Sequence, residues 1–174
     1  MRRALLLLPF TLVLAIGCTA APGPVDPAPT SPPTTAAPSG VTTPMWVSEM
    51  IGRINSERAA AGAGPLQLCT NLASAAQDHS ADQAATSRMS HTGSNGSTMR
   101  QRVEVTGYLG WNSLGENVAA GQPSVSSVMD AWMGSSGHRA NLLSTSFEHV
   151  GFGMASSSSG TPYWTQNFGR RGTC

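Results

Sequence analysis

The chain has 174 residues, and its 10 basic residues, all of them arginine, nearly balance 9 acidic ones. So small a net charge, with no basic cluster, argues against nucleic acid as a partner and gives no long-range attraction to anionic membranes. Only 11% of the residues are charged, so hydroxyl and amide groups must keep the surface soluble, and the length suggests a single domain.

The first 18 residues have the pattern of an export signal. Two arginines precede an apolar run over residues 4–16, which is too short for a permanent membrane span. The run ends in Ala15-Ile16-Gly17-Cys18, which resembles a bacterial lipobox, where the cysteine is lipidated and becomes the new N-terminus. Residues 1–18 are therefore predicted to be a signal peptide, and Cys18 to anchor an exported lipoprotein on the outer side of the cytoplasmic membrane. Cleavage near Ala20-Ala21, giving a secreted protein, is the alternative.

Residues 19–44 have the composition of a linker. They hold eight of the twelve prolines, separated by Thr, Ser and Ala, and a single charge, Asp26. Such a segment cannot bury a core and is predicted to be an extended, disordered tether that holds the rest of the chain away from a membrane. Residues 45–174, in which apolar residues return at regular spacing, are predicted to be the folded domain.

Three cysteines are present, at positions 18, 69 and 174. If Cys18 carries lipid, Cys69 and Cys174 remain, and an even remainder in an oxidising compartment predicts a disulfide. The bridge would close a loop of about a hundred residues, which is worth about 4–5 kcal/mol in the chain-entropy model. Two free thiols outside the cell are the alternative.

Apolar residues recur at helical spacing in four segments: residues 46–61, 70–86 and 99–105, and a segment that begins after Ser124 and includes Trp132. Gly62, Gly64 and Pro65 stop the first helix, and Thr70 or Asn71 can cap the second. His79 falls on the inward stripe of the second helix and is predicted to be packed and hydrogen-bonded. Residues 87–98 are polar and turn-rich, which predicts a loop.

The end of the chain has the pattern of a β-hairpin. Val150, Phe152 and Met154 alternate with small residues, and Trp164 and Phe168 do the same after a serine-rich turn. Helices that precede strands in this way predict an α+β fold, with the helices packed on a small antiparallel sheet.

Eight short motifs follow one another in a characteristic order. They are Asn55-x-x-Arg58 with Gly64-Pro65-Leu66; Ala76-x-x-His79-Ser80; Ser90-His91; Arg102-Val103 with Gly107-Tyr108; Gly115-Glu116-Asn117-Val118-Ala119; Trp132-Met133-Gly134-Ser135 with Gly137-His138-Arg139-x-Asn141-Leu142-Leu143; Val150-Gly151-Phe152-Gly153; and Tyr163-Trp164-Thr165-Gln166-x-Phe168. Over about residues 46–169 this order closely resembles the bacterial branch of the CAP superfamily, also called SCP-like, which includes the cysteine-rich secretory proteins.

The resemblance implies an α–β–α sandwich with a large cleft. At the base of that cleft the family gathers two histidines and two glutamates, which in several members hold a divalent metal, often zinc. Transferred to this sequence, the set falls on His91, Glu116 and His138, while Ser135 stands where the second glutamate belongs. Two imidazoles and one carboxylate are a reasonable ligand set for zinc, but with one negative charge fewer we expect weak, exchangeable binding. Gln166 lies on a strand that the family places beside the cleft.

Two classes of function agree with these residues. The first is a binding module whose cleft, with a polar or divalent-metal-dependent centre, captures a lipid, glycan or protein and that meets the membrane only through the anchor at Cys18. The second is a hydrolase that uses Ser135 or Ser136 with His138 and Glu116, or metal-assisted hydrolysis at the predicted metal site. We favour the binding module, because nucleophile and base lie only two or three residues apart with no nucleophile elbow. Ser135 and His138 are expected on one face at the end of the fourth helix.

Overall fold

The computed structural model describes residues 43–174; the predicted signal peptide, Cys18 and nearly all of the predicted tether lie outside the described residues. The elements, in chain order, are α1 (Met45–Ala60), β1 (Gln67–Leu68), α2 (Thr70–Thr86), α3 (Met99–Val105), β2 (Ser113–Ala120), α4 (Val125–Gly134), α5 (Ser136–Leu143), β3 (His149–Ser156) and β4 (Pro162–Arg170). Within this part of the chain, no helix combines the length and the hydropathy that a membrane span requires.

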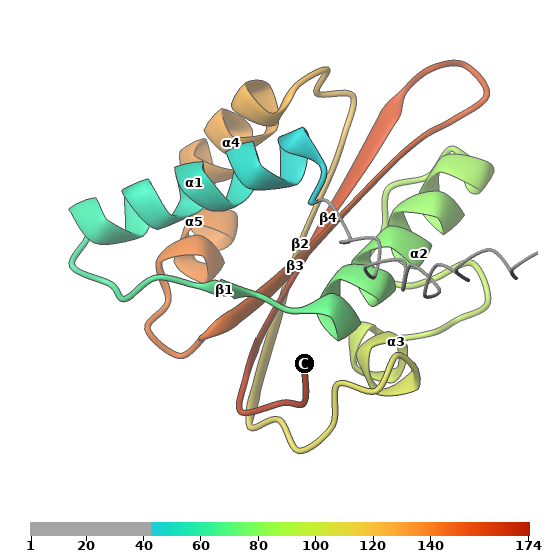
Figure 1. Cartoon of the computed structure of the whole chain (residues 1–174). Helices are drawn as coiled ribbons and strands as arrows, with labels where there is room; N and C mark the ends of the chain where they lie inside the picture. Colours follow the sequence, from blue (N-terminus) through green and yellow to red (C-terminus); the bar gives the residue numbers. More distant parts are fainter. Residues whose placement is uncertain (1–42) are drawn as a thin grey trace, which may run out of the picture. The chain divides into compact units, whose positions relative to one another are not determined.

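The four strands make one mixed sheet in the order β1-β3-β4-β2. Strands β3 and β4 form an antiparallel hairpin, β2 lies antiparallel to β4 at one edge, and the short β1 runs parallel to β3 at the other. Figure 1 shows α1, α4 and α5 on one side of this sheet and α2 and α3 on the other. The domain is therefore an α–β–α sandwich of the α+β class, although its sheet is mixed where a wholly antiparallel one was predicted.

The larger hydrophobic core lies between the sheet and the layer of α1, α4 and α5. Its buried members include Met50, Ile54, Val128, Met129, Trp132, Leu142, Val150, Phe152, Trp164 and Phe168. Helix α4 starts where the sequence indicates, because the Ser124 hydroxyl accepts a hydrogen bond from the backbone N–H of Ser127 and completes a capping box. The apolar stripe that follows this cap is buried in the core.

Helix α2 packs on the backbone of β3 because two glycines face it. Along β3, Gly151 and Gly153 alternate with Val150 and Phe152, which point into the larger core. A Cβ atom at Gly151 would overlap the backbone of Ala73, and one at Gly153 would overlap that of the helix one turn later. The missing side chains let the helix and the strand approach more closely than any other residue type would permit.

A second, smaller core joins α2, α3 and the C-terminal tail. Its buried members are Cys69, Leu72, Ala75, Val103 and Tyr108. Cys69 and Cys174 are joined by a disulfide, with their Cα atoms 5.0 Å apart. Beside the bridge, the Thr173 N–H donates to the Leu109 carbonyl at 3.0 Å, and the Asn71 side chain donates to the Thr173 carbonyl at 2.9 Å. The tail thus ties the start of α2 to the loop between α3 and β2.

Three elements were not predicted from the sequence: β1, β2 and α5. Strand β2 contains Gly115, Glu116 and Asn117 in succession, and these residue types are uncommon in strands, so the sequence does not indicate a strand here. Helix α4 ends at Gly134, and Ser135 has an extended backbone with φ −99° and ψ 123° before α5 begins at Ser136. The prediction that Ser135 and His138 share one face of a single helix is therefore wrong, because Ser135 lies at the junction between two helices.

Candidate functional site

Glu116 is the centre of a charged hydrogen-bond cluster on β2. Its side chain is only 4% exposed; Oε1 accepts from Nδ1 of His91 at 2.8 Å, and Oε2 accepts from a guanidinium nitrogen of Arg102 at 2.6 Å. The amide of Asn167 fits its surroundings when its nitrogen donates to the same Oε2 at 3.2 Å and its oxygen accepts from the Ala76 N–H. Charged and hydrogen-bonding partners are what a buried carboxylate needs to remain ionised. We call His91, Arg102 and Glu116 the Glu116 cluster.

Arg102 reaches the carboxylate from α3, and local interactions set its position. Thr98 and Gln101 form a capping box that fixes the start of the helix just before Arg102. The guanidinium also donates to the Ser97 carbonyl at 2.9 Å and to the His91 carbonyl at 3.2 Å. One arginine therefore holds both the carboxylate and the loop that carries the histidine.

Because β2 is an edge strand, the cluster stands where the two helical layers meet. Glu116 faces α2 and α3, and the next residue, Asn117, faces the opposite layer. The Asn117 amide donates to the His138 carbonyl at 3.2 Å, and the Asn141 amide donates to Asn117 Oδ1 at 2.9 Å. These bonds attach α5 to β2 and bring His138 to the same edge of the sheet as the cluster.

His138 is held neutral near its histidine neighbour. Burial lowers the pKa of His138, and the proximity of His91 lowers that pKa further. At neutral pH the ring of His138 therefore carries no charge, and its nitrogens can accept or donate hydrogen bonds without the cost of burying a cation. The edge of the sheet thus presents two histidines beside a carboxylate whose charge an arginine compensates.

This geometry agrees with comparisons to known proteins. The family model for the CAP (cysteine-rich secretory protein) family matches residues 51–168. The chain belongs to the CAP family. The protein YkwD of Bacillus subtilis is 33% identical over 135 residues, which cover 78% of this chain and 50% of that protein. The chain thus spans half the length of this curated relative.

Solved structures show the same CAP fold. An extracellular protein of Bacillus anthracis that contains an SCP domain is 27% identical, with a TM-score of 0.63, over 71% of this chain and 40% of that one. An outer surface protein of Borrelia burgdorferi has a TM-score of 0.66 at 20% identity, over 75% of this chain and 96% of that one. The second likeness shows the fold alone.

The metal site that the CAP resemblance implies is not assembled by these side chains. Both oxygens of Glu116 are occupied, and its bond to Nδ1 of His91 is the arrangement in which a carboxylate orients a histidine instead of binding the metal itself. Within residues 43–174, no three His, Cys, Asp or Glu side chains are grouped to hold a metal ion. The donor set of this arrangement does not fit a three-ligand zinc site, and zinc binding stays a prediction.

Ser135 and Gln166, which were also predicted to lie beside the cleft, have other surroundings in the structure. Ser135 is half-buried at the junction of α4 and α5, and within residues 43–174 no hydrogen bond joins its hydroxyl to His91 or His138. Gln166 is completely buried in β4, where its amide nitrogen points to the sulfurs of Met50 and Met129 at 3.6 and 3.7 Å. Gln166 is therefore a core residue and does not line a cleft.

Arg102 is the functional residue that sequence reasoning missed. Its motif, Arg102-Val103, carries no sign of this role, because its partner, Glu116, lies on a strand that the sequence pattern does not predict. The available signal was local: an arginine one position after a Thr-x-x-Gln capping pattern lies in the first turns of a helix, where its side chain can reach back over the preceding loop.

The buried histidine of α2 gives the fold a pH dependence. His79 is 1% exposed, and its Nε2 lies 2.7 Å from the Ser90 carbonyl. Burial, and then the nearby Arg102, lower the pKa of His79, although Glu116 and Asp82 oppose the shift. The unfolded chain, with a histidine pKa of about 6.5, takes up protons before the folded chain does, so stability should fall as the pH drops below about 6.5.

The measurement is the melting temperature between pH 7.5 and 5, a window that lies above the ordinary pKa of the carboxylates. We expect a plateau above about pH 7, a decline below it, and a shallower decline in His79→Gln. His138, whose pKa is also lowered, supplies the remaining slope. An identical pH slope in the variant and the wild type would contradict the assignment to His79.

Proposed function

We propose that this CAP domain works outside the cytoplasm as a binding module, with the Glu116 cluster and His138 at the centre of its ligand contact. The observation that carries this proposal is that both oxygens of Glu116 accept hydrogen bonds, one from His91 and one from Arg102. A carboxylate fixed in this way is neither a free general base nor a metal ligand. Its effect is to orient the ring of His91.

The chemistry of the site follows from that orientation. Because Nδ1 of His91 donates to the carboxylate, the tautomer with a proton on Nδ1 leaves Nε2 as an acceptor on a side chain that is 61% exposed. His138 adds a second, neutral imidazole at the same edge of the sheet. Ligand groups that donate hydrogen bonds, such as hydroxyl or N–H groups, suit this site better than ions do, since the charges of Glu116 and Arg102 already compensate each other.

The test uses three purified probes: vesicles of phosphatidylglycerol and phosphatidylcholine, soluble glycan strands of bacterial cell wall, and secreted bacterial protein fractionated by size. We expect the wild type to bind one of the three, and binding to weaken at least tenfold in His91→Ala and in His138→Ala. Arg139→Ala is the matched control, because Arg139 is an exposed neighbour of His138 on α5. Equal losses in the control and in the histidine variants, or no binding to any probe, would overturn the proposal.

One outcome would favour the hydrolase instead, and a second would make the site metal-dependent without deciding between the two functions. The first is covalent labelling of Ser135 by a fluorophosphonate probe, which needs an activated hydroxyl. The second is zinc binding in calorimetry that disappears in both Glu116→Gln and His138→Ala. That result would mean that both residues belong to a divalent-metal site. We expect no labelling, and a zinc affinity that rises in Arg102→Gln because that change frees one oxygen of Glu116.

We further propose export and lipid anchoring at Cys18. The lipobox-like sequence before this residue motivates the anchor, and the relative from Bacillus anthracis, described as extracellular, supports export. In a bacterial host, the wild type should sediment with membranes and Cys18→Ala should appear in the medium. A wild type that is already free, with an N-terminus near Ala21 by mass spectrometry, would exclude the lipoprotein and leave a secreted protein.

A further inference from the structure

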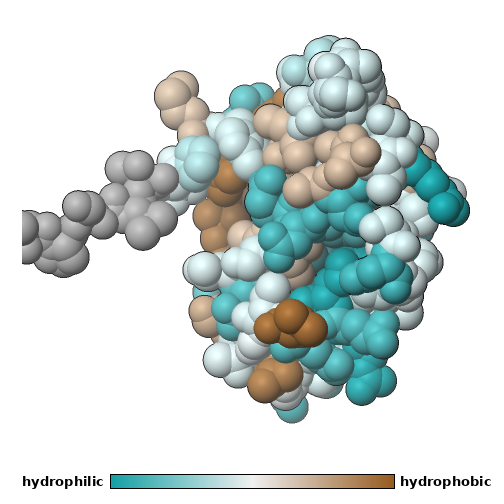
Figure 2. All heavy atoms as spheres, turned by 90° about the vertical axis from the view of Figure 1, so that its right-hand side faces the viewer, coloured by the Kyte–Doolittle hydropathy of each residue, from teal (hydrophilic) through white to brown (hydrophobic). Residues whose placement is uncertain are grey.

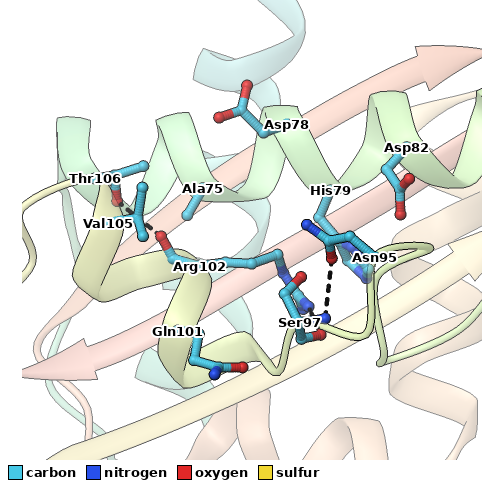
Figure 3. A pocket seen from close by; sticks show the side chains of 10 residues that line it. All are labelled: Ala75, Asp78, His79, Asp82, Asn95, Ser97, Gln101, Arg102, Val105 and Thr106. Carbon is cyan, nitrogen blue, oxygen red and sulfur yellow. Dashed lines mark hydrogen bonds between the residues drawn. The ribbon is translucent and has the colours of Figure 1, made fainter.

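A pocket of about 260 Å³ opens between α2, α3 and the loop over residues 92–98. Figure 2 looks onto the face of the domain that carries α2 and α3, where hydrophilic residues predominate and hydrophobic ones stand isolated. Figure 3 shows the pocket from close by, with Arg102 lying along it. Neither histidine of the proposed ligand contact lines this pocket, nor does Glu116, although Arg102 belongs both to the pocket lining and to the Glu116 cluster.

The pocket combines an apolar slot with a polar end. Ala75 and Val105 line the slot together with the aliphatic stem of Arg102, and Val105 stands at its mouth with 87% of its surface exposed. His79 and Asn95 lie together at the other end, as Figure 3 shows. A ligand for such a space must carry both a small apolar group and hydrogen-bonding groups.

Two buried nitrogens along the pocket have no hydrogen-bond partner in the described domain: Nδ1 of His79 and Nε of Arg102. Since Nε2 of His79 donates to the Ser90 carbonyl, Nδ1 carries a lone pair and is an acceptor. The Nε–H of Arg102 is a donor. Unpaired buried polar groups cost about 1–3 kcal/mol each, and a ligand that supplies one donor and one acceptor would recover both.

The charges around the pocket exclude ionic ligands. Asp78 and Asp82 lie on the α2 side, and the guanidinium of Arg102 is already paired with Glu116, so an anion would meet net negative charge. A cation would face the Nε–H donor of Arg102. Asp82 is also committed to the loop, because it accepts from the N–H and the hydroxyl of Ser94. The ligand that fits is neutral.

We propose that this pocket binds the acetamido group of an N-acetylated sugar. The amide N–H would donate to His79 and the amide carbonyl would accept from Arg102, while the methyl group lies against Ala75 and Val105. Both nitrogens are shielded from solvent, so the group that pairs with them must displace neighbouring side chains and insert between the helices. The sugar ring remains at the mouth, near Gln101 and Asp78, whose polar groups suit hydroxyls.

A peptide also offers amides, but the pocket favours the sugar. Its volume lies just below the ~300–1,000 Å³ range of ordinary ligand pockets, which suits one ring with its substituent. A peptide segment would need further backbone partners along an extended groove, whereas this pocket is lined by side chains of α2 and α3 and by Asn95 and Ser97 of the loop.

The experiment is a titration of the purified chain followed by ¹⁵N NMR, which includes the Nε–H signal of Arg102. N-acetylglucosamine should bind in the millimolar range and shift the signals of Ala75, Asn95 and Arg102 Nε. Glucose, which lacks the acetamido group, should bind at least tenfold more weakly, because a site built around an amide rejects the analogue without it. N-acetylalanine methylamide, which carries the same acetamido group on a peptide, serves as the peptide probe and should bind more weakly only to the extent that the sugar hydroxyls contact the mouth of the pocket.

Variants at exposed positions test where the sugar binds without destabilising the fold. Val105→Glu places a charge at the mouth and should weaken N-acetylglucosamine binding at least tenfold, whereas Leu109→Glu, at an exposed residue outside the pocket, should leave it unchanged. No shift at 50 mM N-acetylglucosamine, equal responses to glucose, or equal losses in both variants would overturn the proposal. If the peptide probe bound more tightly than N-acetylglucosamine, the ligand of this pocket would be a peptide and not a sugar. His91→Ala should not change any of these results, which separates this pocket from the proposed ligand contact.

Discussion

Alanine at Gly153 should cost the domain most or all of its stability. A Cβ atom there would overlap the backbone of Ala76 on α2, and no flexible side chain lies in between that could move away. Overpacking of a core typically costs about 1–3 kcal/mol, and a clash of backbone with backbone should exceed that range. Against a total stability of about 5–15 kcal/mol, we expect a melting temperature at least 15 °C lower, or no cooperative transition in calorimetry.

Gly52→Ala is the matched control for this experiment. Gly52 lies within α1, and a Cβ atom at this position would meet nothing within 4 Å. Alanine in a helix interior is favoured over glycine by about 0.5–1 kcal/mol, so this variant should melt slightly higher than the wild type. A Gly153→Ala variant that melts within a few degrees of the wild type would show that α2 does not lie against the backbone of β3.

Breaking the disulfide by Cys174→Ser should lower the free energy of unfolding by about 4–5 kcal/mol, because the bridge closes a loop between residues 105 positions apart. The second effect is local. The tail beside the bridge holds the Leu109 carbonyl and Asn71, so its release should raise hydrogen exchange in the loop between α3 and β2. That loop separates Arg102 from Glu116 along the chain.

Urea unfolding under oxidising and reducing conditions measures this effect. The wild type should lose stability when reduced, and Cys174→Ser should be equally stable under both conditions. Cys174 is the better position to change, since it is exposed whereas Cys69 is buried and any replacement there would also disturb the second core. A variant that matches the oxidised wild type would mean that the bridge contributes nothing to folding.

Local patterns were sufficient to predict α1 to α4 and the hairpin of β3 and β4. The stripe of α4 and its Ser124 cap, the stop of α1 before Gly62, and the alternation of Val150 with Gly151 depend only on neighbours along the chain. Strand β2 lacks such a signal. It becomes a strand because β4 offers it a complete row of backbone partners, from Ser113 opposite Arg170 to Ala120 opposite Tyr163.

Gln166 shows why the tertiary structure, and not the strand pattern, decided which polar residues are buried. In a sheet with one exposed face, polar residues mark the outer side. Here helices cover both faces of β4, so Thr165 lies under α2 and Gln166 under α1 and α4, and both are buried with partners of their own. Alternation along the strand could not show which polar residues would reach solvent.

The sequence by itself determined the family, the order of most elements and two of the partners at the cleft, His91 and Glu116, because these depend on short motifs in a fixed order. Only the tertiary structure decided that Arg102 neutralises Glu116 and that Ser135 lies between two helices. The physical reason is distance along the chain: Arg102 and Glu116 are 14 residues apart, and they meet because α3 is pinned by its cap and by the second core. A charge pair of that kind exists only once the layers have packed.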